Sequence, residues 1–172
     1  LVVSDLDAAR LRESVGGDVS VTVIPNGVDV DYFRPADYDF KRQEGLIFAG
    51  GLNVYTNREA MLFFVREVWP LLVKENPARR ITIIGKNPPR ELLNAGNESN
   101  LVATGFVDDV RPYFDAAKIY VCPITNGGGT RLKILDALAM AKPLVATAFA
   151  VEGLNLVEGE HYLRAETPLE FV

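Results

Sequence analysis

The chain has 172 residues, about the length of one ordinary domain. Its net charge of −5 and its pI near 5.0 argue against nucleic-acid binding, and its apolar runs are too short to cross a bilayer. One cysteine and one histidine provide neither an internal disulfide nor a cluster of metal ligands.

The first forty residues differ in pattern from the rest. The chain starts without Met on the strand-like triplet Leu1–Val3, and residues 20–24 predict a second strand that ends at the turn Pro25-Asn26-Gly27. Charged and turn-forming residues at 29–42 then interrupt the apolar rhythm. We therefore expect a strand-helix-strand piece at 1–40 and a separate unit at 41–172. Because the chain ends at Val172 inside an expected helix beginning at Thr167-Pro168, we also expect it to be part of a longer protein.

From residue 45 onward, apolar runs alternate with amphipathic stretches, which is typical of a parallel α/β sheet. Several of the runs are continuously apolar, as expected for strands covered on both faces. The predicted class is an open parallel Rossmann-like sheet with helices on both faces. Strands are expected at 45–49, 80–84, 101–104, 119–122 and 144–147. Helices are expected at 57–74 with a kink at Pro70, at 108–117 with Asp108 as N-cap, and at 130–140 with Thr130 as N-cap.

Four of the expected strands end in glycine or polar residues: Gly50-Gly51, Gly85-Lys86, Gly105-Phe106 and the stretch leading to Gly127–Gly129. In open parallel sheets, ligands bind outside the carboxyl ends of the strands, so these ends predict a cleft that a ligand can approach closely. The chain contains neither GxGxxG opening a helix nor GxxxxGK[ST]. A Rossmann dehydrogenase and a P-loop NTPase are therefore disfavoured.

The segment GGGTRLKILDALAM predicts an anion site. Gly128, Gly129 and Thr130 precede Arg131 and Lys133, although the partial positive charge at a helix N-terminus disfavours cations there. An anion over the glycine loop would remove this conflict, with Asp136 about one turn deeper. Three simpler interpretations remain open: a flexible surface loop, a solvated Arg131, and an exposed Lys133–Asp136 ion pair. The pair Asp108-Asp109 favours helix capping over a phosphoacceptor or a metal site.

Five segments in the same order resemble the large family-four glycosyltransferases of GT-B fold: VIPNGVDVDYF (23–33), FAGGLN (48–53), ITIIGK (81–86), ATGFVDDV (103–110) and GGGTRLKILDALAMAKPLVAT (127–147). The resemblance covers nearly the whole chain. It implies that residues 1–40 are the tail of the N-terminal acceptor domain with the hinge. Residues 41–172 would be the C-terminal domain that holds the nucleotide-sugar donor.

The resemblance also assigns roles to residues. Asp136 falls where the family's second glutamate grips the ribose, and Gly128 falls where the first glutamate contacts the sugar. The family's diphosphate-clamping arginine and lysine fall on Gly51 and Asn57, so Arg131 and Lys133 are expected to replace them. Phe106 would lie against the nucleobase. The expected donor-site residues are Gly50, Gly51, Lys86, Phe106, Gly128, Gly129, Thr130, Arg131, Lys133 and Asp136.

The function implied by the resemblance is transfer of a sugar from a nucleoside-diphosphate sugar, with retention and without metal or further cofactor. Catalytic groups near the acceptor would come from the missing N-terminal domain, so we expect the chain to be inactive alone. The GxGTRLK pattern is similar to that of bacterial enzymes that assemble surface polysaccharides. The lone Cys122, in an expected buried strand, favours a reducing compartment. We expect a cytoplasmic location, with contact at the inner face of the membrane through the missing domain left open. The alternatives are a nucleotide-sugar epimerase of the same fold and a non-catalytic α/β interaction module.

Overall fold

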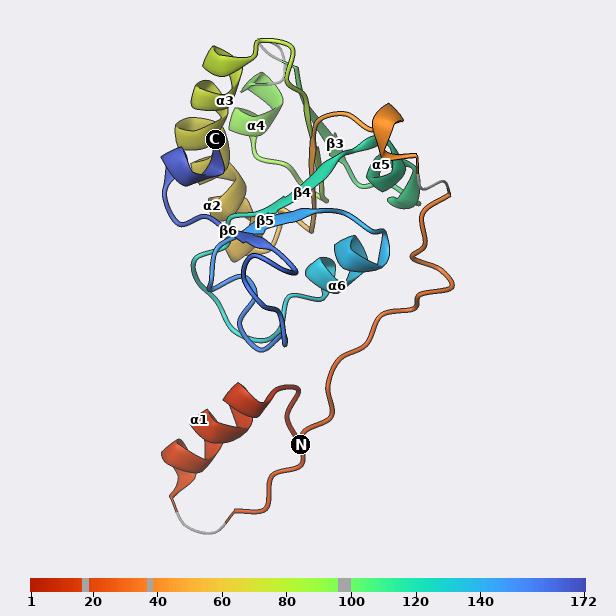
Figure 1. Cartoon of the computed structure of the whole chain (residues 1–172). Coiled ribbons are helices and arrows are strands. Elements are labelled where there is room, and N and C mark those ends of the chain that lie inside the picture. The colour runs from red at the N-terminus through yellow and green to blue at the C-terminus, as the bar shows by residue number, and fades with distance from the viewer. Residues whose placement is uncertain (17–18, 37–38, 96–99) are drawn as a thin grey trace.

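The computed structural model describes residues 1–16, 19–36, 39–95 and 100–172. Its centre is a six-stranded sheet in which neighbouring strands run parallel in the order β3-β2-β1-β4-β5-β6 (Figure 1). This arrangement confirms the predicted open parallel α/β class. The strands are β1 (Leu46–Ala49), β2 (Ile81–Ile84), β3 (Leu101–Gly105), β4 (Ile119–Cys122), β5 (Leu144–Ala146) and β6 (Leu163–Arg164).

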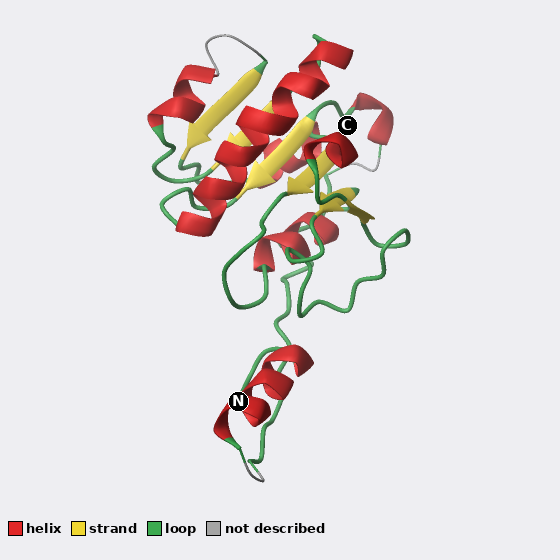
Figure 2. Cartoon of the chain, turned by 90° about the vertical axis from the view of Figure 1, so that its left-hand side faces the viewer, coloured by secondary structure: helices red, strands yellow, loops and turns green. Residues whose placement is uncertain are grey.

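Both faces of the sheet are covered by helices (Figure 2). Along β1, Leu46 and Phe48 enter one apolar cluster and Ile47 and Ala49 enter the other, because successive side chains of a strand point to opposite faces. The first cluster packs against α2 (Tyr55–Phe63), α3 (Trp69–Glu75) and α4 (Arg90–Ala95), and the second against α5 (Arg111–Ala116) and α6 (Leu132–Ala139). None of the helices in the described ranges combines the length and apolar character that crossing a bilayer requires.

The helix expected at 57–74 is regular only in part. α2 and α3 are joined by a π-helical turn over Phe64–Val68, just before Pro70. Proline has no N–H to donate and its ring crowds the carbonyl four residues earlier, so the helix widens locally to accommodate it. The widened turn still buries Phe64, Val65 and Val68, and Phe64 meets Phe171 edge to face with ring centroids 5.9 Å apart. Phe171 belongs to the 3₁₀ turn Pro168–Phe171, where the sequence predicted a helix.

The N-terminal piece forms less strand than predicted. Residues 20–24 contribute only one parallel bridge within the described residues, from Val23 to Val2. The helix α1 (Asp5–Val15) lies between these two residues in the sequence, and Ser4 caps its N-terminus. The six-stranded sheet does not include the 20–24 segment. The helix α1 also lies away from that sheet in Figure 1. Phe33, further along the N-terminal piece, packs against the apolar cluster that α5 and α6 cover. The boundary at residue 40 stays a prediction.

Candidate functional site

A cavity of about 410 Å³ opens at the carboxyl ends of the strands. It lies beside the boundary between β1 and β4, where the strand order reverses direction and where open α/β sheets bind ligands. The loops after three strands and the first turns of α6 supply its walls. The lining residues are Ala49, Gly50, Gly51, Ile84, Gly85, Lys86, Gly105, Phe106, Val107, Val110, Phe114, Lys133 and Asp136.

The floor of the cavity depends on two loops that touch. A Cβ atom at Gly85 would lie 2.1 Å from the carbonyl oxygen of Gly50, a separation that only the absence of a side chain allows. The loops are also tied by hydrogen bonds from Gly50 N to Ile84 O (2.9 Å) and from Leu52 N to Lys86 O (3.1 Å). Backbone, rather than bulky side chains, therefore forms this side of the site.

Lys133 enters the cavity from the first turn of α6. Its Nζ donates a hydrogen bond to Asn57 Oδ1 at 2.6 Å and lies 5.9 Å from the centroid of the buried Phe48 ring. Burial lowers the pKa of Lys133, because it removes water from the ammonium. An anionic ligand in the cavity would offset that loss of hydration.

Asp136 lies one helical turn after Lys133 and lines the same cavity. Burial raises the pKa of its carboxyl group, and the positive charge of Lys133 opposes part of that rise. The structure thus holds one cation and one anion at a cavity where burial disfavours both charged forms. Charged groups whose pKa values are perturbed by burial in a cleft mark a candidate functional site.

We expect Asp136→Asn to raise the melting temperature at pH 7. The raised pKa of Asp136 means that its protonated form favours folding. The charged form therefore costs stability above that raised pKa, whereas below the ordinary aspartate pKa of about 3.9 the cost is absent. Thermal unfolding between pH 3 and pH 8 should show a gain that shrinks with acidification. Asp108→Asn, at an exposed position, is the control, and a neutral-pH loss for Asp136→Asn would contradict the expectation.

Another part of the cavity wall is apolar. Val107, Val110 and Phe114 line it, and the Phe106 ring stands at the rim with 72% of the residue exposed. Lys86 is also exposed at the rim. An exposed aromatic ring beside a cavity that carries a cation deeper inside offers a surface on which a flat ring system can stack.

Arg131 does not line this cavity, although the sequence grouped it with Lys133. It is the N-cap residue of α6, and its guanidinium Nη1 donates to the carbonyl of Gly129 while its carbon lies 4.5 Å from the Phe149 ring centroid. Because Arg131 is the non-helical residue before α6 and Lys133 belongs to its first turn, the two cations line different hollows.

Arg131 is 93% buried, and within the described residues its Nη2 has no hydrogen-bond partner. Burial lowers its pKa. Arg131 lines a small hollow between the glycine loop and the N-terminal piece, together with Gly128, Gly129, Thr130 and residues of α1 and of the loop after β5: Ser4, Leu6, Asp7, Arg10, Glu152 and Gly153. The expected site residues are thus divided between two neighbouring hollows.

Two contacts connect the N-terminal piece to this region. The amide of Asn26 donates to the Thr130 hydroxyl, and Arg10 pairs with Glu152 at 3.3 Å. The predicted N-cap role of Thr130 is wrong because its hydroxyl takes this contact and α6 begins at Leu132. Asp108 is not an N-cap either, since α5 begins at Arg111 after Val110.

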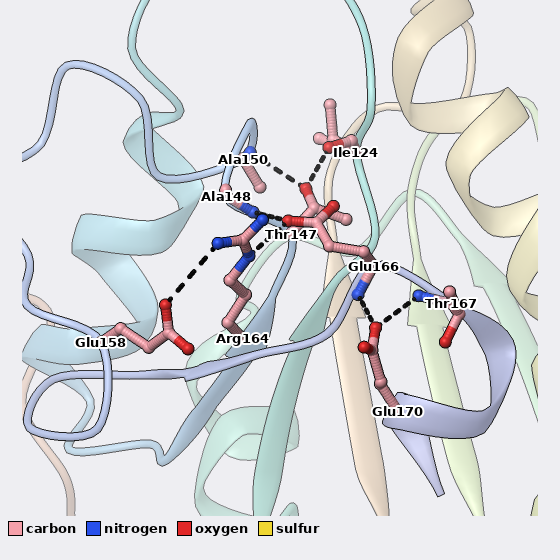
Figure 3. A network of polar contacts seen from close by, with 9 residues as sticks. All are labelled: Ile124, Thr147, Ala148, Ala150, Glu158, Arg164, Glu166, Thr167 and Glu170. Carbon is pink, nitrogen blue, oxygen red and sulfur yellow. Dashed lines mark hydrogen bonds and ion pairs between the residues drawn. The ribbon is translucent and has the colours of Figure 1, made fainter.

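A polar network holds the loop that follows β5 (Figure 3). After β5, the Thr147 hydroxyl donates to the Ile124 carbonyl and accepts from Ala150 N at 3.0 Å. Glu166 Oε1 accepts from Ala148 N at 2.9 Å and from Arg164 Nε at 2.8 Å. These bonds hold the backbone on both sides of Phe149, the residue whose ring packs on Arg131.

Comparison with known families shows to which family the chain belongs. A family model described as glycosyl transferases group 1 matches residues 43–171. The chain belongs to the group 1 glycosyl transferases. The matched range contains both the cavity and the glycine loop.

This glycosyl transferase chain is similar to parts of longer proteins and to one isolated domain. The phosphatidyl-myo-inositol mannosyltransferase of Mycobacterium tuberculosis is 27% identical over 177 residues, covering 98% of this chain and 46% of that protein. Anabaena HepE, solved in complex with UDP and glucose, matches with a TM-score of 0.72 at 16% identity, covering 98% of this chain and 50% of that one. The C-terminal domain of the group 1 protein LpcC from Francisella tularensis matches with a TM-score of 0.61 at 22% identity, covering 84% and 83%. The chain spans about a third to a half of the curated relatives it matches.

Sequence reasoning missed one residue of this group 1 glycosyl transferase site. Asn57 is 96% buried and bonds to Lys133, although the sequence had marked it only as a lost clamp position. The helical spacing of the apolar residues around Asn57 could have identified it. Asn57 lies on the stripe with Ala60, Met61 and Phe64 that α2 buries, and a polar residue on an apolar helix face needs polar partners.

Proposed function

We propose that the cavity above β1 and β4 is the donor site of a glycosyltransferase that transfers a sugar from a nucleoside-diphosphate sugar to an acceptor. The observation that carries the proposal is the convergence of Lys133, Asp136 and Phe106 on one cavity at the switch point of the sheet. Membership of the group 1 family supports it. So does the similar fold of HepE, which was solved with UDP and glucose.

The three side chains fit different parts of such a donor. Lys133 can bind the diphosphate, Asp136 can accept hydrogen bonds from ribose hydroxyls, and Phe106 can stack on the base. Gly50, Gly51 and Lys86 would border the donor on the strand side. Gly128, Gly129 and Thr130 would border its sugar end, and Arg131 would hold the glycine loop from behind through the Gly129 carbonyl.

The reaction requires stabilisation of the nucleoside diphosphate as negative charge develops on it. A fixed ammonium and the N–H groups at the start of α6 can supply this stabilisation. We therefore propose that the chain's own cation at Lys133 performs this role without a metal. We also propose that the transfer retains the anomeric configuration of the sugar, because the family resemblance implies it. NMR of the linkage in the product would test this proposal.

The domain assignment completes the proposal. Residues 41–172 would form the donor domain and residues 1–40 would be the end of an acceptor domain with the hinge. The contacts Asn26–Thr130 and Arg10–Glu152 support an N-terminal part that lies against the sugar end of the donor. Groups acting on the acceptor would then come from that N-terminal part, which would also make any membrane contact.

Titration of the protein with UDP and GDP by isothermal calorimetry tests this function. We expect Asp136→Ala to weaken nucleoside-diphosphate binding about tenfold while leaving inorganic pyrophosphate within twofold, because pyrophosphate has no ribose; loss of hydrogen bonds to a charged group costs about 1.5–3 kcal/mol. Equal losses for both ligands would remove Asp136 from the ribose role. Absence of binding to UDP and GDP by the wild-type protein would refute the donor site.

A further inference from the structure

The buried amide of Asn57 connects two sides of the cavity that are far apart in sequence. Its Oδ1 accepts from Lys133 Nζ at 2.6 Å, and its Nδ2 donates to the Gly51 carbonyl at 2.9 Å. Asn57 itself is 96% buried in α2. One side chain thus joins the cation of α6 to the loop that follows β1.

The direction of the amide follows from its neighbours. A carbonyl oxygen can only accept and an ammonium can only donate, so Oδ1 must face Lys133 and Nδ2 must face Gly51. The lysine uses one of its three N–H groups in this bond. Two N–H groups are left for a ligand in the cavity.

The packing around the pair is tight. A Cβ atom at Gly50 would lie 2.9 Å from Lys133 Cε and 3.2 Å from Asn57 Nδ2. The lysine stem and the amide therefore both lie against the glycine loop, where a side chain at residue 50 would displace them. Phe48 closes the space beneath the ammonium. These contacts restrict a side chain that is flexible in most proteins.

We propose that Asn57 is a positioning residue for the donor diphosphate, acting through Lys133 and through the Gly50-Gly51 loop. It aims the ammonium into the cavity and fixes the loop against which the diphosphate lies. Pre-organisation of this kind lowers the ordering cost of binding. The inference rests on the proposed donor site and adds a residue that touches the phosphate-binding group rather than the ligand.

The test compares binding of UDP, GDP, inorganic pyrophosphate and uridine by isothermal calorimetry. Asn57→Asp keeps the shape but replaces the donor to Gly51 by a carboxylate that competes for the ammonium, and Asn57→Ala removes both bonds. We expect five- to twentyfold weaker binding of nucleoside diphosphate and pyrophosphate in each variant. Uridine, which has no phosphate, should bind within twofold of wild type. Asn100→Ala is the matched control, since Asn100 Nδ2 also donates to a backbone carbonyl, Pro77 O at 3.1 Å, just before β3 begins.

An exchange of the two side chains separates positioning from structure. Lys133→Asn alone should weaken nucleoside-diphosphate binding more than tenfold. The double variant Asn57→Lys/Lys133→Asn returns an ammonium to within a few ångströms of its place, because Nζ and Oδ1 are 2.6 Å apart. We expect the double variant to recover at least a third of the decrease in the logarithm of the binding constant that Lys133→Asn alone causes.

The outcomes are distinct. Wild-type diphosphate affinity in folded Asn57→Asp, or equal losses for uridine and UDP, would overturn the positioning role and leave the donor site standing. A wild-type protein that binds neither UDP nor GDP would overturn both. Circular dichroism and melting curves on each variant identify those that are folded, and Asn57→Asp, which keeps the shape of the side chain, tests the role if Asn57→Ala does not fold.

Discussion

Lys133→Met should weaken nucleoside-diphosphate binding about ten- to a hundredfold. The ammonium enters the cavity from α6 and keeps two N–H groups for the ligand after its bond to Asn57. A hydrogen bond between charged groups contributes about 1.5–3 kcal/mol, and each 1.4 kcal/mol corresponds to about a factor of ten. Methionine keeps most of the length and removes the charge. Calorimetric titration with UDP and GDP measures the effect.

Lys118→Met is the matched control for that experiment. Lys118 is exposed just before β4 begins, at the end of the sheet opposite the cavity, so the net charge changes equally while the site is untouched. We expect its affinity to stay within twofold of wild type. Similar losses in both variants would mean that overall charge, rather than the placement of Lys133, controls binding. The Lys133 role would then be discarded.

Gly85→Ala should destabilise the protein by about 3 kcal/mol or more and disrupt the cavity floor. The new methyl group would lie 2.1 Å from the Gly50 carbonyl oxygen and 2.9 Å from Leu52 Cγ. The first neighbour is backbone, so relief requires the two loops to separate, and overpacking of this kind costs about 1–3 kcal/mol even where side chains can adjust. For a chain of this size each kcal/mol lowers the melting temperature by roughly 2–4 °C. Differential scanning calorimetry would measure the shift.

Gly128→Ala provides the comparison. No atom lies within 4 Å of a Cβ built at Gly128, and its backbone is outside the positive-φ region. We expect a change of less than about 0.5 kcal/mol, as for most surface positions. If Gly85→Ala melted at the same temperature as Gly128→Ala, the two loops would not be in the contact described.

The sequence predicted the layers of the fold because each layer has a local signal. Leu46–Ala49 is continuously apolar, and the structure buries alternate residues of it in two clusters. The strand at 20–24 was the failure. Its apolar pattern is equally local, but a strand needs a neighbour to pair with, and the main sheet does not include this segment.

The site predictions likewise succeeded where they depended on a short motif and failed where they depended on the tertiary structure. The order of residues in GGGTRLKILDALAM located a cation and an acid one turn apart, and the structure brings Lys133 and Asp136 to one cavity with Phe106. Sequence alone could not tell that Arg131 faces the other way, because its direction depends on where α6 begins. The structure begins that helix at Leu132, which leaves Arg131 as the non-helical residue before it.

The sequence by itself therefore determined the parallel sheet, the glycine-bearing strand ends and the family, since these depend on periodicity and on short motifs. Only the tertiary structure decided which polar groups meet. The contact between Asn57 and Lys133 joins residues 76 positions apart. It depends on the order β3-β2-β1-β4-β5-β6, which places β1 beside β4, so that residues following these two strands can meet at the carboxyl edge of the sheet. Strand order is a long-range property that no local pattern encodes.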